Sequence, residues 1–279
     1  MTRTIRTCAG IGDNIWLLQK LINTGEHFNF ELPDGKPQRG RQVFDILPQV
    51  AASCRYVPGL TYKTLAAKTE RGRWKDIKSQ SFYLSCNAHL EAGRNLKEFL
   101  PDLPISYKLP WHLPVVNTQY LRPLIGIYGS AYSTQRAWKQ YGAWGVDEWL
   151  TLIKLIHSVD KEYIFIIIGA EWDTDFANEL QGKLTALDIP FENTIGQSLV
   201  YVGWLMKQFH YAFYFPSGLP ILSESLTGSS DCTMFYTSNI AKIARTWADP
   251  ERIKNGNFKE CLFCSPEKIF EWCIQNKKI

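Results

Sequence analysis

Hydrophobic residues fall into short apolar runs that alternate with stretches of helical spacing. The runs TIRTCAG (4–10) and FNFELP (28–33) bracket a segment from Asn14 to Thr24 whose apolar residues recur every three or four positions. Such spacing predicts an amphipathic helix, and short apolar runs bounded by glycine or proline predict strands. The chain is therefore expected to open as a strand, a glycine turn, a helix and a second strand, the start of a βαβ unit.

The second half of the chain repeats this alternation with longer apolar runs. LIGIYGS, YIFIIIG, YAFYF and CTMFY are nearly continuous in apolar residues, as parallel strands covered on both faces are. The helices predicted between them lie around Trp149 to Ile156, at about 172–187, at 199–209 and up to Leu226. This alternation indicates a doubly wound α/β domain.

Prolines punctuate the stretch between the halves, at Pro110, Pro114 and Pro123, and predict a linker. We therefore expect an α/β protein with two Rossmann-like doubly wound domains that face a central cleft, because ligands bind at the carboxyl ends of such sheets. The expected bounds are 1–118 for an N-terminal acceptor-binding domain, 119–265 for a C-terminal donor-binding domain, and 266–279 for a final helix that could pack back on the N-terminal domain.

Composition narrows the class of protein. The chain has 279 residues, 45% of them hydrophobic, and no run approaches the roughly 18 apolar residues of a membrane-spanning helix. The seven cysteines include one close pair, Cys261 and Cys264, with no second pair or histidines to complete a zinc site. We expect a soluble, cytoplasmic protein with reduced thiols.

The net charge of +4 conceals an asymmetry. Residues 1–122 hold 17 Lys and Arg against 10 Asp and Glu, a balance of +7, and the remainder holds 14 against 17, a balance of −3. Basic residues gather at 36–78, in KPQRGRQ and ERGRWKDIK, with aromatic neighbours. This density favours an anionic partner, either a phosphorylated saccharide or nucleic acid.

The segment GIGDNIWLLQKL carries the first candidate chemistry. A dinucleotide fingerprint would need a small residue where Ile15 stands, and no Gly-Lys-Ser/Thr follows to make a phosphate-binding Walker loop. Gly10 and Gly12 allow a tight turn, after which Asp13 either caps the helix or projects into the cleft as a catalytic carboxylate. The residues alone leave both interpretations open.

The same segment resembles the G-x-G-D turn that opens the heptosyltransferase-type glycosyltransferases, a family of two-domain GT-B enzymes. Four later segments resemble that family in order: STQRAWKQYGAWGVDEWLTLI, FIIIGAEWDTDFANEL, NTIGQSL and FYFPSGLPILSESL. The resemblance covers residues 4–24 and most of 124–236. It implies the GT-B fold and transfer of a sugar from a nucleotide-diphosphate sugar to an acceptor hydroxyl by a metal-independent, inverting displacement.

The resemblance also implies roles for residues. Asp13 would act as general base, and helix N-terminal N–H groups with a nearby cation would stabilise the departing diphosphate. No metal and no cofactor are expected; the sugar nucleotide is a co-substrate. The donor-binding residues would be Gly12, Arg136, Lys139, Gly169, Glu171, Ser198, Ser217, Gly218 and Leu219. The acceptor contacts would be Asn14 and, from a helix expected in LSCNAHLEAGRNLKEFL, His89 and Arg94.

Two departures keep alternatives open. Pro216 and Ile221 stand where the family has an acidic residue and a histidine, so a nucleotide-sugar-binding module without catalysis is one alternative. A sugar-nucleotide epimerase is another, and the basic first half allows a phage-type enzyme that glycosylates a hydroxylated DNA base. Asp173 and Asp175 have the spacing of a metal-binding pair, although two acidic residues also suit a helix start.

Overall fold

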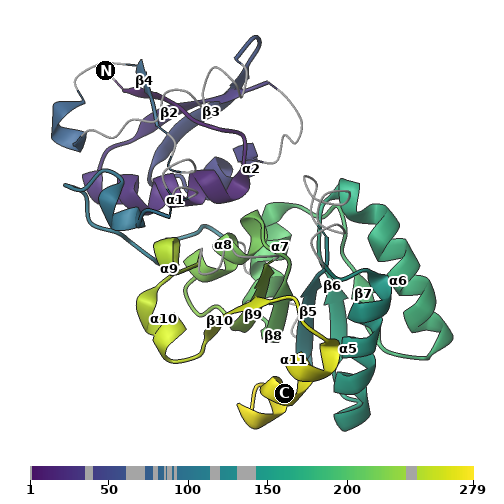
Figure 1. The fold of residues 1–279 in the computed structure, drawn as a ribbon. Helices are drawn as coiled ribbons and strands as arrows, with labels where there is room; N and C mark the ends of the chain where they lie inside the picture. The colour runs from purple at the N-terminus through teal and green to yellow at the C-terminus, as the bar shows by residue number, and fades with distance from the viewer. Residues whose placement is uncertain are drawn as a thin grey trace. The chain divides into compact units, whose positions relative to one another are not determined.

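The computed structural model describes residues 2–34, 40–60, 73–77, 81–84, 86, 90, 93–113, 120–130, 143–236 and 244–279. The chain divides into two compact units (Figure 1). Unit 1 consists of Met1–Pro114, Ile221–Thr227 and Lys242–Pro250, and unit 2 of Val115–Pro220, Gly228–Ala241 and Glu251–Ile279. Two segments from the second half of the chain thus belong to unit 1, which the predicted boundaries did not include.

Unit 1 contains a four-stranded parallel sheet in the order β3-β2-β1-β4. Its α1 and α2 lie on the same side of this sheet (Figure 1). The main elements are β1 (Thr4–Arg6), α1 (Ile11–Leu21), β2 (Phe28–Pro33), α2 (Arg41–Asp45), β3 (Ala51–Val57), β4 (Ser81–Tyr83) and α9 (Ala244–Trp247). Short 3-10 turns cover Ile22–Thr24, Trp74–Asp76 and Leu96–Glu98.

The two faces of the unit 1 sheet differ in polarity. On one face Ile5 and Phe30 are fully buried, and Phe30 stacks on Phe44 of α2 with ring centroids 4.2 Å apart. On the other face the register aligns two polar rows, Thr4 with Asn29 and Ser53, and Arg6 with Glu31 and Arg55. Because side chains alternate along a strand, the helices bury only one of these faces.

Unit 2 contains a six-stranded parallel sheet in the order β10-β9-β8-β5-β6-β7. The predicted strands and helices of the second half are present, which confirms the α/β class. The elements are β5 (Leu124–Tyr128), α5 (Val146–Val159), β6 (Ile164–Ile167), α6 (Thr174–Ala186), β7 (Phe191–Asn193), α7 (Leu199–Met206), β8 (Phe209–Tyr214), α8 (Gly218–Ser225), β9 (Asp231–Tyr236), α10 (Pro250–Lys254), β10 (Phe258–Leu262) and α11 (Pro266–Gln275). The last residues of α8 belong to unit 1.

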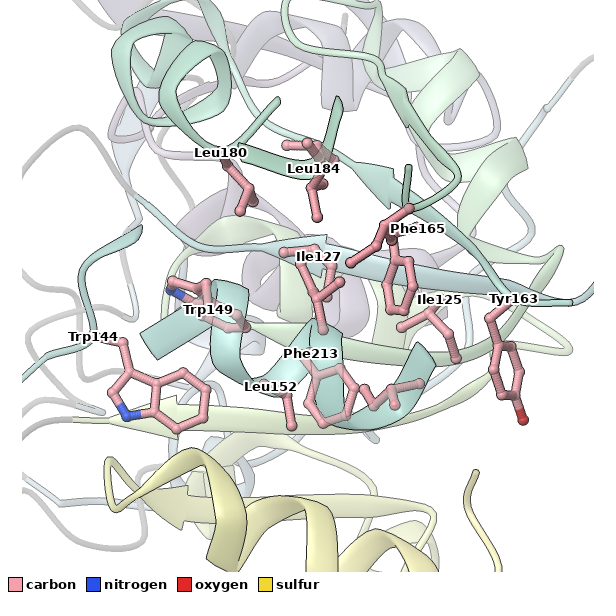
Figure 2. Close-up of a cluster of buried hydrophobic side chains, with 14 of the residues drawn as sticks. Ile125, Ile127, Trp144, Trp149, Leu152, Tyr163, Phe165, Leu180, Leu184 and Phe213 are labelled. Carbon is pink, nitrogen blue, oxygen red and sulfur yellow. The ribbon is translucent and has the colours of Figure 1, made fainter. Parts of the chain in front are cut away.

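A cluster of buried apolar side chains lies between the unit 2 sheet and its helices α5, α6 and α11. Figure 2 shows Leu180 and Leu184 of α6 pointing toward the strand residues Ile127 and Phe165. All five residues of β5 are buried, so this strand is covered on both faces. Continuous apolar strands therefore end up in the centre of a covered sheet, as the sequence predicts.

The final helix packs differently from the expectation for 266–279. Ile269 and Cys273 of α11 are buried in the same core as α5, and Nζ of Lys278 pairs with Oδ2 of Asp231 at 2.7 Å. Ile269 and Cys273 are four residues apart, so their side chains lie on one face of the helix. This face is covered within unit 2. The prediction that this helix packs back on the N-terminal domain is corrected accordingly.

The helix expected in LSCNAHLEAGRNLKEFL is only partly described, and its C-terminal part is not α-helical. Leu96–Glu98 form a 3-10 turn, which begins where Oδ1 of Asn95 accepts a hydrogen bond from the backbone N–H of Lys97 at 2.9 Å. Asparagine favours such local capping over continuation of a helix.

In the described part of the chain, no helix is both long and apolar enough to cross a membrane.

Candidate functional site

Each sheet has one switch point, a position where the connections that leave two neighbouring strands run to opposite sides of the sheet. In unit 1 this switch lies between β1 and β4, and in unit 2 between β5 and β8. Loops at such a point diverge to opposite faces and leave a crevice at the carboxyl ends of the strands, where α/β proteins bind ligands. The two switch points are therefore the first places to look for functional side chains.

Asp13 lies beside the switch point of unit 1. Helix α1 begins at Ile11 directly after the turn that follows β1, and Asp13 is half-buried in its first helical turn. A Cβ atom at residue 10 would overlap Oδ2 of Asp13, so Gly10 is required for the carboxylate to lie over the turn. The positive end of the helix dipole favours the ionised carboxylate there, which is the form that accepts a proton.

Asn14, the next residue, holds this turn in place. Its side chain is fully buried. Its Oδ1 accepts a hydrogen bond from the Thr7 hydroxyl at 3.0 Å, and its Nδ2 donates to the carbonyl oxygens of Cys8 and Gly10 at 3.0 and 2.9 Å. With the amide committed to three partners inside the turn, the predicted acceptor contact of Asn14 is replaced by a positioning role for Asp13.

The loop after β4 supplies the other side of the unit 1 switch point. Cys86 is buried, and its Sγ lies 3.9 Å from the backbone carbonyl oxygen of Asp13. Burial raises the pKa of the Cys86 thiol well above its usual value, and the negative charge of Asp13 raises it further. The thiol is therefore neutral at physiological pH, and it was not anticipated from the sequence because nothing marked the end of β4.

Five of the predicted donor-binding residues of unit 2 lie just beyond neighbouring strands of one sheet. Gly169 and Glu171 follow β6, Ser198 follows β7, and Ser217 and Gly218 follow β8. Glu171 and Ser198 are exposed, and Ser217 and Gly218 are half-buried. Since β8, β5, β6 and β7 are adjacent and parallel, these residues share the carboxyl edge of the sheet.

Two of these loops are held together by close backbone contacts. Gly196, which follows β7 with a φ of +81°, donates a backbone hydrogen bond to the carbonyl of Gly169 at 3.2 Å. A Cβ at residue 169 would come within 2.6 Å of the Ile195 side chain and 2.8 Å of Oδ2 of Asp173. Gly169 is therefore a packing position, and its donor-binding role would have to use its backbone.

Ser198 and Ser217 each begin a helix. Oγ of Ser198 accepts a hydrogen bond from the backbone N–H of Tyr201 at 3.3 Å and caps α7. Oγ of Ser217 lies 3.4 Å from the N–H of Leu219 at the start of α8. Leu219 itself is buried, so its backbone N–H rather than its side chain faces the turn. Free N–H groups at a helix start are suited to bind phosphate oxygens.

Tyr128 is the last residue of β5 and lies close to residues of the loops after β6 and β8. It is buried, and Ser217 and Asp173 both lie near enough to its hydroxyl to act on the pKa of that group. Burial raises the pKa of Tyr128 far above its usual value, and the Asp173 charge adds to this effect. The hydroxyl therefore stays protonated beside Ser217, and sequence reasoning missed it because Tyr128 is part of an apolar strand.

Asp173 and Asp175 do not converge as a metal-binding pair would. Asp173 is buried and its Oδ2 accepts a hydrogen bond from the N–H of Ala170 at 2.9 Å, whereas Asp175 is exposed on α6. This geometry favours the capping interpretation. Among the described residues, no group of three His, Cys, Asp or Glu side chains is placed to hold a metal ion.

The remaining predicted site residues divide into two groups. Arg136, Lys139 and His89 lie outside the described residues. Gly12 is buried at the second position of α1, where its backbone is part of the helix start, and Arg94 is half-buried after the turn at Gly93. The structure therefore groups Gly12 with Asp13, and it leaves Arg94 as a prediction.

The two parallel sheets with flanking helices define a two-unit α/β protein of the GT-B type. No protein-family model matches the chain, and no curated protein matches it in sequence. Solved structures do match. The E. coli ADP-heptose LPS heptosyltransferase II has a TM-score of 0.64 and 14% identity, with 99% of this chain and 100% of that chain covered.

Two structures of the E. coli heptosyltransferase WaaC match as well. The one with ADP has a TM-score of 0.56 and 12% identity, covering 99% of this chain and 98% of that one. The one with ADP-2-deoxy-2-fluoro heptose has a TM-score of 0.57 and 13% identity, covering 98% and 99%. The resemblance to heptosyltransferases that the motifs indicate is thereby confirmed at the level of the fold.

Proposed function

We propose that this protein is a glycosyltransferase that moves a sugar from a nucleotide-diphosphate sugar to an acceptor hydroxyl. The proposal rests above all on the position of Asp13. A half-buried carboxylate lies beside the switch point of the first sheet, in a chain whose whole length matches structures of sugar-transferring enzymes.

In the proposed reaction Asp13 is the general base. The acceptor oxygen attacks the anomeric carbon of the donor sugar while its proton passes to the carboxylate of Asp13, and the bond from that carbon to the diphosphate oxygen breaks. A single displacement of this kind inverts the configuration at the anomeric carbon. A positioned base contributes about 10²- to 10⁴-fold to the rate of such a step, and Gly10 and Asn14 fix the base in place.

The donor is proposed to bind at the carboxyl edge of the unit 2 sheet. The backbone N–H groups at the start of α8, with Ser217, would receive the diphosphate and stabilise the charge that develops as it departs. The WaaC structures hold ADP and an ADP-sugar, which supports an adenine nucleotide as the first donor to try. This proposal uses no metal ion.

A comparison of Asp13→Asn with the parent protein tests the proposal. A thermal-shift panel of nucleoside diphosphates and sugar nucleotides first identifies the donor, because a ligand that binds only the folded state raises the unfolding midpoint. With that donor, we expect Asp13→Asn to retain the midpoint shift and to lose about 10²- to 10⁴-fold in the rate of donor consumption with a mixed pool of saccharide acceptors. Asp175→Asn, an exposed carboxylate on α6, is the matched control.

Each alternative gives a different result in the same assay. A parent protein that binds the donor and neither hydrolyses nor transfers it would be a binding module. A parent that converts the donor alone into a new isomer would be an epimerase. A parent whose transfer is unchanged by Asp13→Asn would contradict the assignment of the general base.

A further inference from the structure

The segment CLFC (261–264) places two cysteines three positions apart at the end of β10, and the proposed reaction does not use them. Cys261 is the fourth residue of this strand, and Cys264 lies in the short turn that leads into α11. Both are free thiols and both are half-buried, whereas four of the other five cysteines are buried. Reagents in solution can therefore reach this pair more readily than most thiols of the chain.

The two cysteines lie on the same side of the chain. Cys261 and Cys264 both pack against the apolar core of unit 2, which includes Ile269 and Cys273 of α11. Cys264 also lies near enough to the Cys261 thiol to raise its pKa. Two cysteines at this spacing that share one side of the chain are the arrangement in which proteins form a reversible intramolecular disulfide.

The backbone around Cys264 is held by hydrogen bonds. The backbone N–H of Phe263 donates to the carbonyl oxygen of Tyr236 in β9 at 3.1 Å, and Nε1 of Trp144 donates to the carbonyl oxygen of Cys264 at 2.7 Å. The Phe263 ring stacks on Phe235, with ring centroids 5.1 Å apart. The fold therefore keeps the two cysteines near each other, without relying on the encounter of two separate loops.

The Cys261 thiol is held in its protonated form. Its Sγ donates a hydrogen bond to the carbonyl oxygen of Leu262 at 3.2 Å. Burial and the neighbouring Cys264 raise the pKa of the Cys261 thiol from 9.0 to about 11. Because the thiolate is the attacking form and its nucleophilicity rises only in part with its pKa, such a thiol attacks a disulfide about tenfold more slowly than an ordinary one near neutral pH. Cys261 is therefore suited to react second, after Cys264.

We propose that Cys261 and Cys264 form a thiol–disulfide exchange site that reacts with small disulfides of the glutathione class. The sulfur of Cys264 attacks one sulfur of the reagent, whose S–S bond breaks, and the first thiol that is released takes up the proton of Cys264. The sulfur of Cys261 then attacks the sulfur of Cys264, and the second released thiol takes up the proton of Cys261. Two electrons and two protons pass to the reagent, and a disulfide joins Cys261 to Cys264.

The test treats the reduced, folded protein with oxidised glutathione near neutral pH, blocks the remaining thiols with N-ethylmaleimide and digests the product with trypsin. Cleavage after Lys259 and Lys268 releases residues 260–268, a peptide that contains both cysteines of the pair and no other cysteine. We expect this peptide to have lost two hydrogen atoms and to carry no maleimide, and dithiothreitol should reverse the change. Cys54→Ser, which removes a half-buried thiol of unit 1, should leave the result unchanged.

The two single variants of the pair should differ from each other. Cys261→Ser removes the second thiol, so a mixed disulfide with glutathione should accumulate on Cys264. Cys264→Ser leaves Cys261, which should acquire glutathione about tenfold more slowly. Circular dichroism establishes that each variant is folded, and the experiment on the parent protein stands without them.

Three results would overturn the proposal. They are a parent peptide 260–268 that keeps maleimide on both cysteines, a disulfide that joins Cys261 to Cys273 instead, and equal rates of glutathione uptake in the two single variants. Because neither a donor nor an acceptor is present, none of these outcomes bears on the Asp13 experiment.

Discussion

The sheets of the two units are built from the same strand-helix alternation and are buried to different extents. In unit 2 every residue of the central strand β5 is buried. In unit 1 the central strand β1 buries Ile5 and leaves Thr4 and Arg6 partly or fully exposed. The difference shows that one sheet is a covered scaffold, whereas the other presents charged and polar side chains on a face as well as at its edge.

The two units also differ in where their polar side chains lie. In unit 2, polar side chains such as Ser198 and Ser217 are in the loops beyond the strands. In unit 1, Glu31, Arg6 and Arg55 are on the strands themselves, where the sheet backbone fixes their positions. Strand positions hold a side chain more precisely than loops do.

Alanine substitutions at successive strand positions test most directly whether the two sheets are covered differently. Leu124→Ala and Ile125→Ala in β5 lie on opposite faces, and both residues are buried, so each should lower the free energy of unfolding by about 2–5 kcal/mol. In β1, Ile5→Ala should cost the same, whereas Thr4→Ala should stay within about 0.5 kcal/mol. Urea denaturation measures all four variants, and a Thr4→Ala cost equal to that of Leu124→Ala would show that both sheets are covered alike.

The turns that start the first helix in unit 1 and α7 in unit 2 offer a second comparison. Asn14→Ala removes the three hydrogen bonds that the buried amide makes with the Thr7 hydroxyl and with the carbonyl oxygens of Cys8 and Gly10 and should cost about 1–3 kcal/mol. Ser198→Ala removes one exposed cap from α7 and should cost about 1 kcal/mol or less. Thermal denaturation of the two variants distinguishes them, and the reverse order would contradict the positioning role of Asn14.

A buried lysine makes the stability of unit 1 depend on pH. Lys20 of α1 is 1% exposed and its Nζ donates to the carbonyl oxygens of Leu103 and Leu100 at 2.8 and 3.4 Å. Burial lowers the pKa of Lys20 from 10.5 to about 8. Between pH 8 and 10.5 the unfolded chain therefore binds more protons at this residue than the folded chain, and stability rises with pH.

The contribution of Lys20 is measured as the difference between the parent protein and Lys20→Met. We expect the stability of the parent relative to the variant to be constant below pH 8. Above that pH it should increase by up to about 1.4 kcal/mol per pH unit toward pH 10.5. The subtraction removes the contributions of buried tyrosines and cysteines, which titrate in the same range. A flat difference from pH 7 to 10.5 would contradict the lowered pKa.

Most strands of unit 2 could be predicted because their residues form continuous apolar runs. Parts of unit 1 lack such runs and could not be predicted in this way. YIFIIIG and CTMFY have the run of apolar residues that a covered strand requires, and both are strands. AASCRYV also forms a strand, β3, but its residues are half-buried or exposed throughout, so no hydrophobic pattern marks it. The partner of α11 could not be predicted either, because Ile269 and Cys273 define an apolar face without specifying what covers it.

The candidate site was predicted in its main-chain features and less well in its side chains. The turn before Asp13 follows from Gly10 and Gly12, since glycine is needed wherever backbone and side chain approach so closely. The neighbouring amide was misjudged because a polar residue in such a turn can face either the ligand or the backbone. Asn14 faces the backbone, and only its burial reveals this.

Unit 1 contains segments from both halves of the chain. This composition affects how unit 1 folds during translation, because the segments leave the ribosome at different times. Trp247 packs against Trp16 with ring centroids 6.0 Å apart, and Leu109 receives its backbone partner, Ser225, from the same distant part of the chain. Domains usually fold as units, N-terminal first, during translation. Here the nascent N-terminal region must wait until residue 250 has been added before its own packing is complete, and until then it exposes apolar surface that chaperones would be expected to cover.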